Sequence, residues 1–216
     1  MTLSAIHIRS ACSGDLPVLH RLIESSVRGL QAGDYTPSQI EGALGTALGL
    51  DTQLIADNTY FIAEIRTEAE GALAVGCGGW SFRKTLFGSD HGPGREAALL
   101  DPATDAAKIR AIFVHPDWAR RGIGTLILKH CEDAAISAGF CCFEMGSTLT
   151  GVSLYRLKGY VETERIAVPL PNGEALPVVR MRKDLRKTDL RRVADDLAQQ
   201  HLDWAKRRPA DYKVPY

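Results

Sequence analysis

The sequence predicts one mixed α/β domain, of the α+β type, with helices on a central sheet. The centre of the chain reads as a strand over 111–114, a glycine-containing turn over 119–124 and a helix that continues to Ala138. Apolar or alternating runs on both sides of this unit predict further strands. A length of 216 residues is sufficient for a single hydrophobic core of ordinary domain size. We assign that domain to residues 1–183.

The first third of the chain predicts one strand and two helices. Residues 5–9 alternate between apolar and polar side chains, as a half-buried strand does. Asp15 is expected to cap the next helix, whose apolar face runs from Leu16 to Leu30. The run 36–39, Thr-Pro-Ser-Gln, is a capping box that predicts a second helix over 40–50, weakened by three glycines.

Two strands are expected next, over 59–65 and 73–82, around a turn at 67–71. The second contains Gly76, Gly78 and Gly79, which indicates a bulge or a close backbone approach. Trp80 fits either a core aromatic or a wall of a substrate pocket. The irregular segment 83–107 is long enough to predict a loop that is either functional, with a role in acceptor choice, or disordered.

The remaining elements alternate in type. Gly139 is expected to end the central helix, a strand follows over 140–145, and a short helix covers 152–158. Strands over 161–168 and 178–182 are joined by Asn172-Gly173, a strong hairpin signal. Residues 184–216 form a separate C-terminal helical extension. Its apolar face is expected to dock on the domain or on a second subunit, which allows a homodimer; this face carries Leu190, Val193, Leu197 and Trp204.

Composition limits the class of partner. Lys and Arg number 26 and Asp and Glu number 26, so no charge surplus argues for nucleic acid. No apolar run reaches the roughly 18 residues of a membrane span, and no leader pattern is present, so we expect a cytoplasmic protein without a membrane partner. Five cysteines without a CxxC pair predict neither a disulfide framework nor a metal site. Cys141 and Cys142 are expected to be buried.

The central turn is suited to binding a phosphate. The first turn of a helix has N–H groups without internal partners, and Gly122 and Gly124 allow a ligand close to that backbone. Arg120 and Arg121 add positive charge. The dinucleotide fingerprint would need a third glycine where Ile127 stands, and no Gly-Lys-Ser/Thr run is present for a P-loop.

Two motifs resemble those of the GNAT superfamily of acetyl-CoA-dependent N-acetyltransferases. The run 119–124 is similar to motif A, Arg/Gln-x-x-Gly-x-Gly/Ala, with Ala119 at the first position. The run 153–160 is similar to motif B, with Leu154 in place of the usual aromatic residue before Tyr155. The resemblance covers about residues 5–183. It implies a mostly antiparallel mixed sheet that splays at the acetyl-CoA site.

The resemblance also implies a function. We expect transfer of an acetyl group from acetyl-CoA to a primary amine, with a small molecule favoured over a protein as acceptor and no metal required. The alternative is a non-catalytic acyl-CoA-binding sensor module, against which the intact Tyr155 argues.

Residue roles follow from the same resemblance. Backbone N–H groups of 121–125 would hold the pyrophosphate, strand 112–114 would pair with the pantetheine arm, and the Val114 N–H would polarise the thioester carbonyl. Thr148 stands where many members have an Asn that contacts the arm. Tyr155 would protonate the leaving thiolate. The expected acetyl-CoA contacts are Ile112, Phe113, Val114, Arg120, Arg121, Gly122, Ile123, Gly124 and Thr125.

The general base is left open by the sequence. A common family position for it, four residues before Val114, holds Arg110, which cannot accept a proton. The candidates are Glu144, Glu64, Glu96 and His115, with a chain of water molecules as the alternative.

Overall fold

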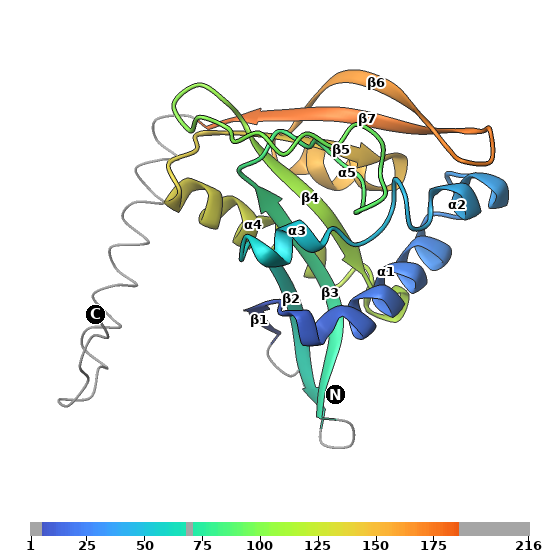
Figure 1. Cartoon of the computed structure of the whole chain (residues 1–216). Helices are drawn as coiled ribbons and strands as arrows, with labels where there is room; N and C mark the ends of the chain where they lie inside the picture. The colour runs from blue at the N-terminus through green and yellow to red at the C-terminus, as the bar shows by residue number, and fades with distance from the viewer. Residues whose placement is uncertain (1–5, 68–70, 186–216) are drawn as a thin grey trace. The chain divides into compact units, whose positions relative to one another are not determined.

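The structure is a computed structural model that describes residues 6–67 and 71–185 (Figure 1). The predicted C-terminal helix therefore lies outside the described residues, apart from Asp184 and Leu185. Two short 3₁₀ turns, Ser13–Asp15 and Pro116–Trp118, accompany the main elements. These elements are β1 (His7–Ser10), α1 (Leu16–Leu30), α2 (Pro37–Ala43), α3 (Thr52–Ala56), β2 (Tyr60–Thr67), β3 (Gly71–Ser81), β4 (Ala107–Val114), α4 (Ile123–Ser137), β5 (Cys142–Thr148), α5 (Leu149–Leu157), β6 (Val161–Pro169) and β7 (Ala175–Asp184).

The strands form one seven-stranded sheet in the order β1-β2-β3-β4-β5-β7-β6. The pairs β1–β2, β2–β3, β3–β4 and β6–β7 are antiparallel, whereas β4 and β5 are parallel. β4 and β5 pair at Ala107 with Phe143 and at Lys108 with Glu144, and their pairing ends there. The predicted fold class, a mixed and mostly antiparallel sheet that splays, is confirmed.

Helices α1 and α4 cover opposite faces of the sheet. Cys77 and Phe113 belong to the core cluster that α1 completes with Leu19, Ile23 and Val27. On the other face, a Cβ at Gly76 would lie 2.8 Å from both the Ile123 and the Ile127 side chains of α4. The absence of a side chain at this glycine therefore allows α4 to pack directly on β3.

A bulge interrupts β4 beside the splay. Cys77 pairs with Phe113 and Gly79 pairs with Arg110, so Ala111 and Ile112 both stand opposite Gly78. Ala111 has a φ of +52°, in the left-handed region. A Cβ at Gly78 would lie 2.7 Å from Ile112 Cγ1, so only glycine fits opposite the bulge. The glycine-rich strand thus has the close approach that its sequence predicts.

Several predicted boundaries need correction. The Asp15 side chain does not cap α1; it accepts a hydrogen bond from the Cys12 N–H and pairs with Arg9. The second helix ends at Ala43, because Leu44 is extended and Gly45 has a φ of +76°. The strand predicted over 140–145 is β5, Cys142–Thr148, and it passes directly into α5 at Leu149, three residues before the predicted helix start.

Other predictions concern single side chains. The capping box at Thr36 is confirmed, since its hydroxyl accepts a hydrogen bond from the Gln39 N–H. Trp80 is a core residue, edge-on to Phe82 and Phe140. Cys141 and Cys142 are half-buried rather than buried. None of the helices in the described ranges combines the length and the apolar character that crossing a bilayer requires.

Candidate active site

A cleft of about 440 Å³ opens where β4 separates from β5. Its lining comes from β4, the turn before α4, the end of α1 and helix α5. Eight of the nine predicted acetyl-CoA contacts line this cleft, and Tyr155 lines it from the opposite side. The remaining predicted contact, Arg121, instead places its guanidinium 4.6 Å from the centre of the Trp118 ring.

The turn before α4 presents free backbone to the cleft. Gly122 is the N-cap residue and has a φ of +84°, a conformation that favours glycine. The first N–H groups of α4 have no partners within the helix, and the positive end of the helix dipole lies here. Gly124 faces Leu154 of α5, whose Cδ2 would be 3.3 Å from a Cβ at this position. Any side chain at 124 would therefore narrow the cleft between the two helices.

The Val114 amide has a partner in the protein. Its N–H donates a hydrogen bond to the hydroxyl of Ser26 on α1, at 3.2 Å. Ser26 also lines the cleft, so this donor lies at the boundary between the cleft and α1. Sequence reasoning expected the amide and missed the serine, although a hydroxyl within an otherwise apolar helix face was a signal for it.

Tyr155 is a buried residue in the lining of the cleft. Its ring packs edge-on against Tyr160, with the ring centres 6.0 Å apart. Burial raises the pKa of the Tyr155 phenol above its ordinary value, with a smaller contribution from Cys131. The group is therefore protonated throughout the neutral range and can act as a proton donor.

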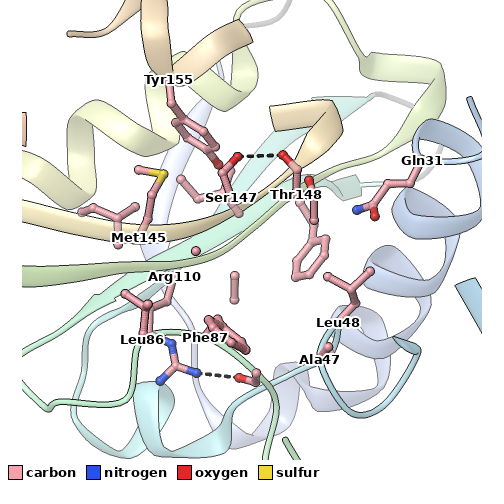
Figure 2. A pocket seen from close by; sticks show the side chains of 17 residues that line it. Gln31, Ala47, Leu48, Leu86, Phe87, Arg110, Met145, Ser147, Thr148 and Tyr155 are labelled. Carbon is pink, nitrogen blue, oxygen red and sulfur yellow. Dashed lines mark hydrogen bonds between the residues drawn. The ribbon is translucent and has the colours of Figure 1, made fainter. Parts of the chain in front are cut away.

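A second pocket of about 70 Å³ lies next to the first (Figure 2). Leu48 comes from the segment after α2, Phe87 from the loop after β3, and Met145 from β5. The two cavities share five lining residues, which are Gln31, Ile112, Phe113, Thr148 and Tyr155. The two cavities are therefore neighbours that border the same five side chains.

Arg110 is the charged residue among those that line the second pocket. Its side chain is 2% exposed, and its guanidinium lies 2.8 Å from Asp51 and donates to the Gly88 carbonyl. Burial lowers the pKa of Arg110, opposed by the charge of Asp51. The group still carries its charge at neutral pH, because an Arg side chain does not deprotonate in proteins.

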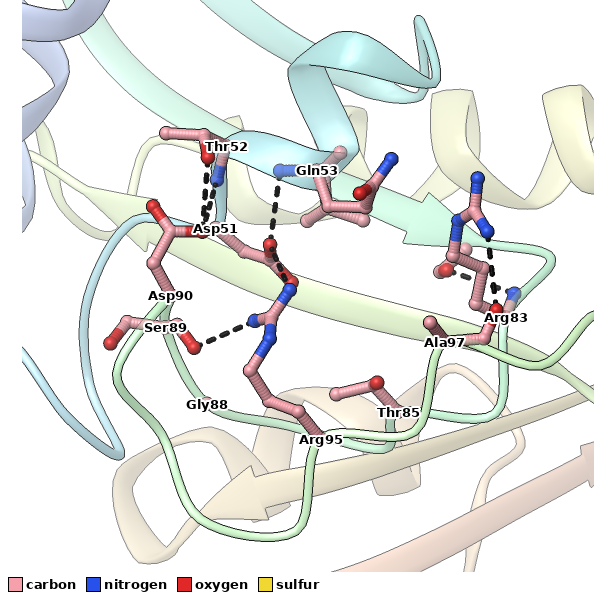
Figure 3. Close-up of polar contacts among 12 residues, drawn as sticks. Asp51, Thr52, Gln53, Arg83, Thr85, Gly88, Ser89, Asp90, Arg95 and Ala97 are labelled. Atoms are coloured by element: carbon pink, nitrogen blue, oxygen red, sulfur yellow. Dashed lines mark hydrogen bonds and ion pairs between the residues drawn. The ribbon is translucent and has the colours of Figure 1, made fainter.

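The loop over 83–106 contains no named helix or strand; backbone hydrogen bonds between its two ends and several ion pairs hold it (Figure 3). Arg95 donates to Asp51 at 3.0 Å and to the Ser89 carbonyl at 2.7 Å. Arg83 pairs with Asp57 at the other end of α3. These contacts fix the part of the loop that supplies Leu86, Phe87 and Gly88 to the pocket.

None of the four candidate bases lines either cavity. Glu144 is held by Lys108 at 2.6 Å and by Arg180 at 2.9 Å. Burial opposes the charge of Glu144, but these two hydrogen bonds outweigh it and the pKa is lowered. Glu64 pairs with Arg9 and Glu96 with Lys84, and the His115 Nδ1 accepts from the Asp117 N–H.

Metal chemistry was not expected from the sequence. In residues 6–67 and 71–185, no group of three His, Cys, Asp or Glu side chains is arranged to hold a metal ion. None of the five cysteines, all of which lie in the described ranges, forms a disulfide, and Cys77 and Cys131 are buried.

A family model, the acetyltransferase (GNAT) domain, matches residues 56–162. This range contains β2 to β5, the turn before α4, and Tyr155. The chain belongs to the GNAT superfamily, and its class is that of the acetyl-CoA-dependent acyltransferases. A comparison with curated proteins gave no match.

Solved structures have the same fold. A GCN5-related N-acetyltransferase (aminotransferase, class-II) from Rhodopseudomonas palustris superposes with a TM-score of 0.60 and 23% identity, over 86% of this chain and 99% of that one. The putative acetyltransferase yncA from Salmonella typhimurium, solved with acetyl-CoA, gives 0.55 and 16%, over 85% and 96%. PaiA N-acetyltransferase from Thermoplasma acidophilum, solved with coenzyme A, gives 0.54 and 14%, over 83% and 99%.

Proposed function

We propose that this protein transfers the acetyl group of acetyl-CoA to the primary amine of a small molecule. The main support for this proposal is the position and lining of the cleft. It opens at the splay of β4 and β5, with the Gly122–Thr125 turn on one wall and Tyr155 on the other. The smaller pocket, which shares Tyr155 with this cleft, would hold the acceptor.

Coenzyme A would bind through backbone at its phosphate end. The N–H groups of 121–125 are free of helical partners, and Gly122 and Gly124 leave them accessible. Arg120, which lines the same part of the cleft, adds positive charge. Two coenzyme A complexes among the structural neighbours support this choice of ligand over another phosphate compound.

The pantetheine arm would run along Ile112 to Val114, where β4 has lost its β5 partner. An extended chain can add to such an open strand edge through main-chain hydrogen bonds. The thioester carbonyl would then lie beside the Val114 N–H and the Ser26 hydroxyl, the two polar groups at this point. The Ser26 hydroxyl can donate to that oxygen, and the Val114 N–H can do so once it leaves Ser26; either donor would stabilise the negative charge that develops there.

In the reaction, the acceptor nitrogen forms a bond to the acetyl carbon and the carbon–sulfur bond breaks. Tyr155 gives its proton to the leaving sulfur, and the nitrogen loses one proton. Water takes that proton, since neither cavity is lined by a described carboxylate or imidazole. The phenolate of Tyr155 recovers a proton from solvent, so the enzyme returns to its starting state.

The test is the release of free thiol from acetyl-CoA in the presence of a panel of primary amines. The acetylated product is identified by mass spectrometry. We expect thiol release that depends on one class of amine and is matched by product. Tight binding of coenzyme A without any amine-dependent release would overturn the proposal in favour of an acyl-CoA-binding sensor.

A further inference from the structure

The side-chain oxygen of Gln31 has no hydrogen-bond partner in the described part of the protein. Gln31 follows α1 as its C-cap residue, is 6% exposed, and has its Oε1 buried without a partner. Buried polar groups are nearly always paired, so an unpaired one needs an explanation, and a bound ligand can supply the missing partner. Rotation about the terminal torsion exchanges the oxygen and nitrogen positions, and no hydrogen bond must break for it.

The position of Gln31 identifies that ligand. Gln31 is one of the five residues that border both cavities, and Figure 2 shows its side chain extending from α1 toward the smaller pocket. The acceptor nitrogen must reach the thioester carbon at this border. Gln31 Oε1 is covered in the unliganded protein, so the amide must first turn to present this oxygen to the cavity. It can then accept an N–H of that nitrogen and leave the nitrogen lone pair free for attack.

The surroundings favour a neutral nitrogen. Most of the residues around it are apolar, including Leu48, Phe87 and Met145. Arg110 is the charged residue in the lining, and Tyr155 is uncharged at neutral pH. An ammonium ion would lose its hydration here without meeting a carboxylate, because burial without a counter-ion disfavours the charged form.

The carboxylates near the pocket already have partners in the protein and do not line the pocket. Asp51 pairs with Arg110 and Arg95 and does not line the pocket. Asp90 accepts hydrogen bonds from the backbone and hydroxyl of Thr52, at 3.0 Å each. From α1, the group that faces the pocket is the neutral Gln31 amide, and from β5 and α5 the facing groups are uncharged.

We propose that Gln31 positions the acceptor nitrogen as a neutral amine, so that the site selects an apolar acceptor whose amine has a low pKa. An α-amino group next to a carbonyl meets this requirement, because such amines have pKa values near 8, whereas alkylamines lie near 10. This inference rests on the proposed acetyl transfer and specifies its acceptor. Gln31 is a positioning residue in this account and exchanges no proton.

The experiment uses matched acceptors with the full-length protein. Each α-amino amide is compared with the amine that lacks its carboxamide, for example L-phenylalaninamide with 2-phenylethylamine. At pH 7 the neutral fractions of such a pair differ by about 10², so we expect kcat/KM to favour the α-amino amide by about that factor. An equal kcat/KM, or turnover confined to alkylamines, overturns the inference.

Two variants test the role of Gln31 itself. Gln31→Met keeps the length and removes the polar group, and we expect the acceptor KM to rise roughly 3- to 10-fold, the value of one neutral hydrogen bond, with the Kd for coenzyme A within about twofold. Gln31→Glu places a carboxylate at the same point, which should stabilise an ammonium and reduce the preference for the α-amino amide. Thermal melting checks that both variants fold.

The outcomes separate the two proposals. A rise in the Kd for coenzyme A with the acceptor KM unchanged would make Gln31 a cosubstrate contact and overturn the inference, while acetyl transfer stands. An absence of thiol release with every amine would instead overturn the proposed function. An unchanged preference in Gln31→Glu would also contradict selection at this residue.

Discussion

The hydroxyl of Tyr60 lies 3.0 Å from the carbonyl oxygen of Ala111, on the side of the β4 bulge that faces the core. Its other neighbour is Cys77 Sγ, at 3.2 Å. The Ala111 carbonyl can only accept, so the single phenolic proton goes to it and the thiol donates to the Tyr60 oxygen. Tyr60 is fully buried, and burial raises the pKa of its phenol, so this donor stays protonated.

Tyr60→Phe should therefore slow the reaction, because it loosens the β4 bulge at Ala111. Without the hydroxyl the Ala111 carbonyl loses its buried partner, which costs roughly 1–3 kcal/mol of folding free energy. The backbone of Ala111–Val114, which would hold the thioester, also becomes less fixed. We expect kcat to fall about tenfold, since small misplacements of reacting groups are costly. Steady-state kinetics measure the fall in kcat. Calorimetry with coenzyme A shows whether cosubstrate binding is lost as well.

Tyr160→Phe is the matched control for that variant. Tyr160 is also buried, and its hydroxyl donates to Glu132 at 2.9 Å, away from both cavities. We expect a similar loss of stability with kcat unchanged. Equal kcat values for Tyr60→Phe and the wild type, despite a lower melting temperature, would reduce Tyr60 to a structural residue.

Gly124→Val should prevent coenzyme A binding. The added branches would enter the space between α4 and Leu154 and would cover the N–H groups of the first helical turn. We expect the Kd for coenzyme A to rise by at least about tenfold, which corresponds to the loss of about 1.4 kcal/mol of binding free energy. Isothermal calorimetry measures it.

Ala119→Gln serves as the comparison at the same turn. It restores the residue type common in motif A, and because the phosphate contacts are main-chain groups, binding should be nearly unchanged. Wild-type affinity in Gly124→Val would show that the phosphates bind elsewhere.

Local sequence signals were sufficient to predict the side of the candidate site that contains Gly122 and Tyr155. Gly122 as the start of α4 and Tyr155 before Gly159 are marked by neighbours within a few residues, and their elements were predicted with small boundary errors. The fold class followed from the same kind of pattern, together with the resemblance of two motifs.

The acceptor side depends on contacts between distant segments. Asp51 lies 59 residues before Arg110, and nothing adjacent to either residue indicates their ion pair. Asp15 was misassigned as a cap for the same reason, because Arg9 competes for its carboxylate. The missed helix α3 did have a local signal, since the Asp51 side chain accepts from the Gln53 N–H as an N-cap does.

Glu144→Gln tests whether that residue is a base or a structural anion. The pKa of Glu144 is lower in the folded protein than its ordinary value near 4.3. Its ion pairs therefore contribute stability that is fully present above the ordinary pKa. This stability is lost as the pH falls through the lower, folded-state pKa. We expect the variant to lose roughly 2 kcal/mol of unfolding free energy at pH 7, and the difference to shrink below about pH 4. Urea unfolding at the two pH values measures this.

The pH dependence of kcat/KM gives the second readout for Glu144. Because the side chain is held by Lys108 and Arg180 and lines neither cavity, the profile between about pH 6 and 9 should be that of the wild type. The disappearance of a limb of that profile would make Glu144 the base after all.

Tyr155→Phe removes one proton donor and keeps the ring that packs on Tyr160. A general acid contributes on the order of 10²–10⁴ in rate, so we expect kcat to fall at least about 10²-fold. The Kd for coenzyme A and the melting temperature should change little. Because burial raises the pKa of this phenol, the wild-type rate should show no loss of the acid form below about pH 10. A descending limb near neutral pH, or full kcat in the variant, would assign proton donation to another group.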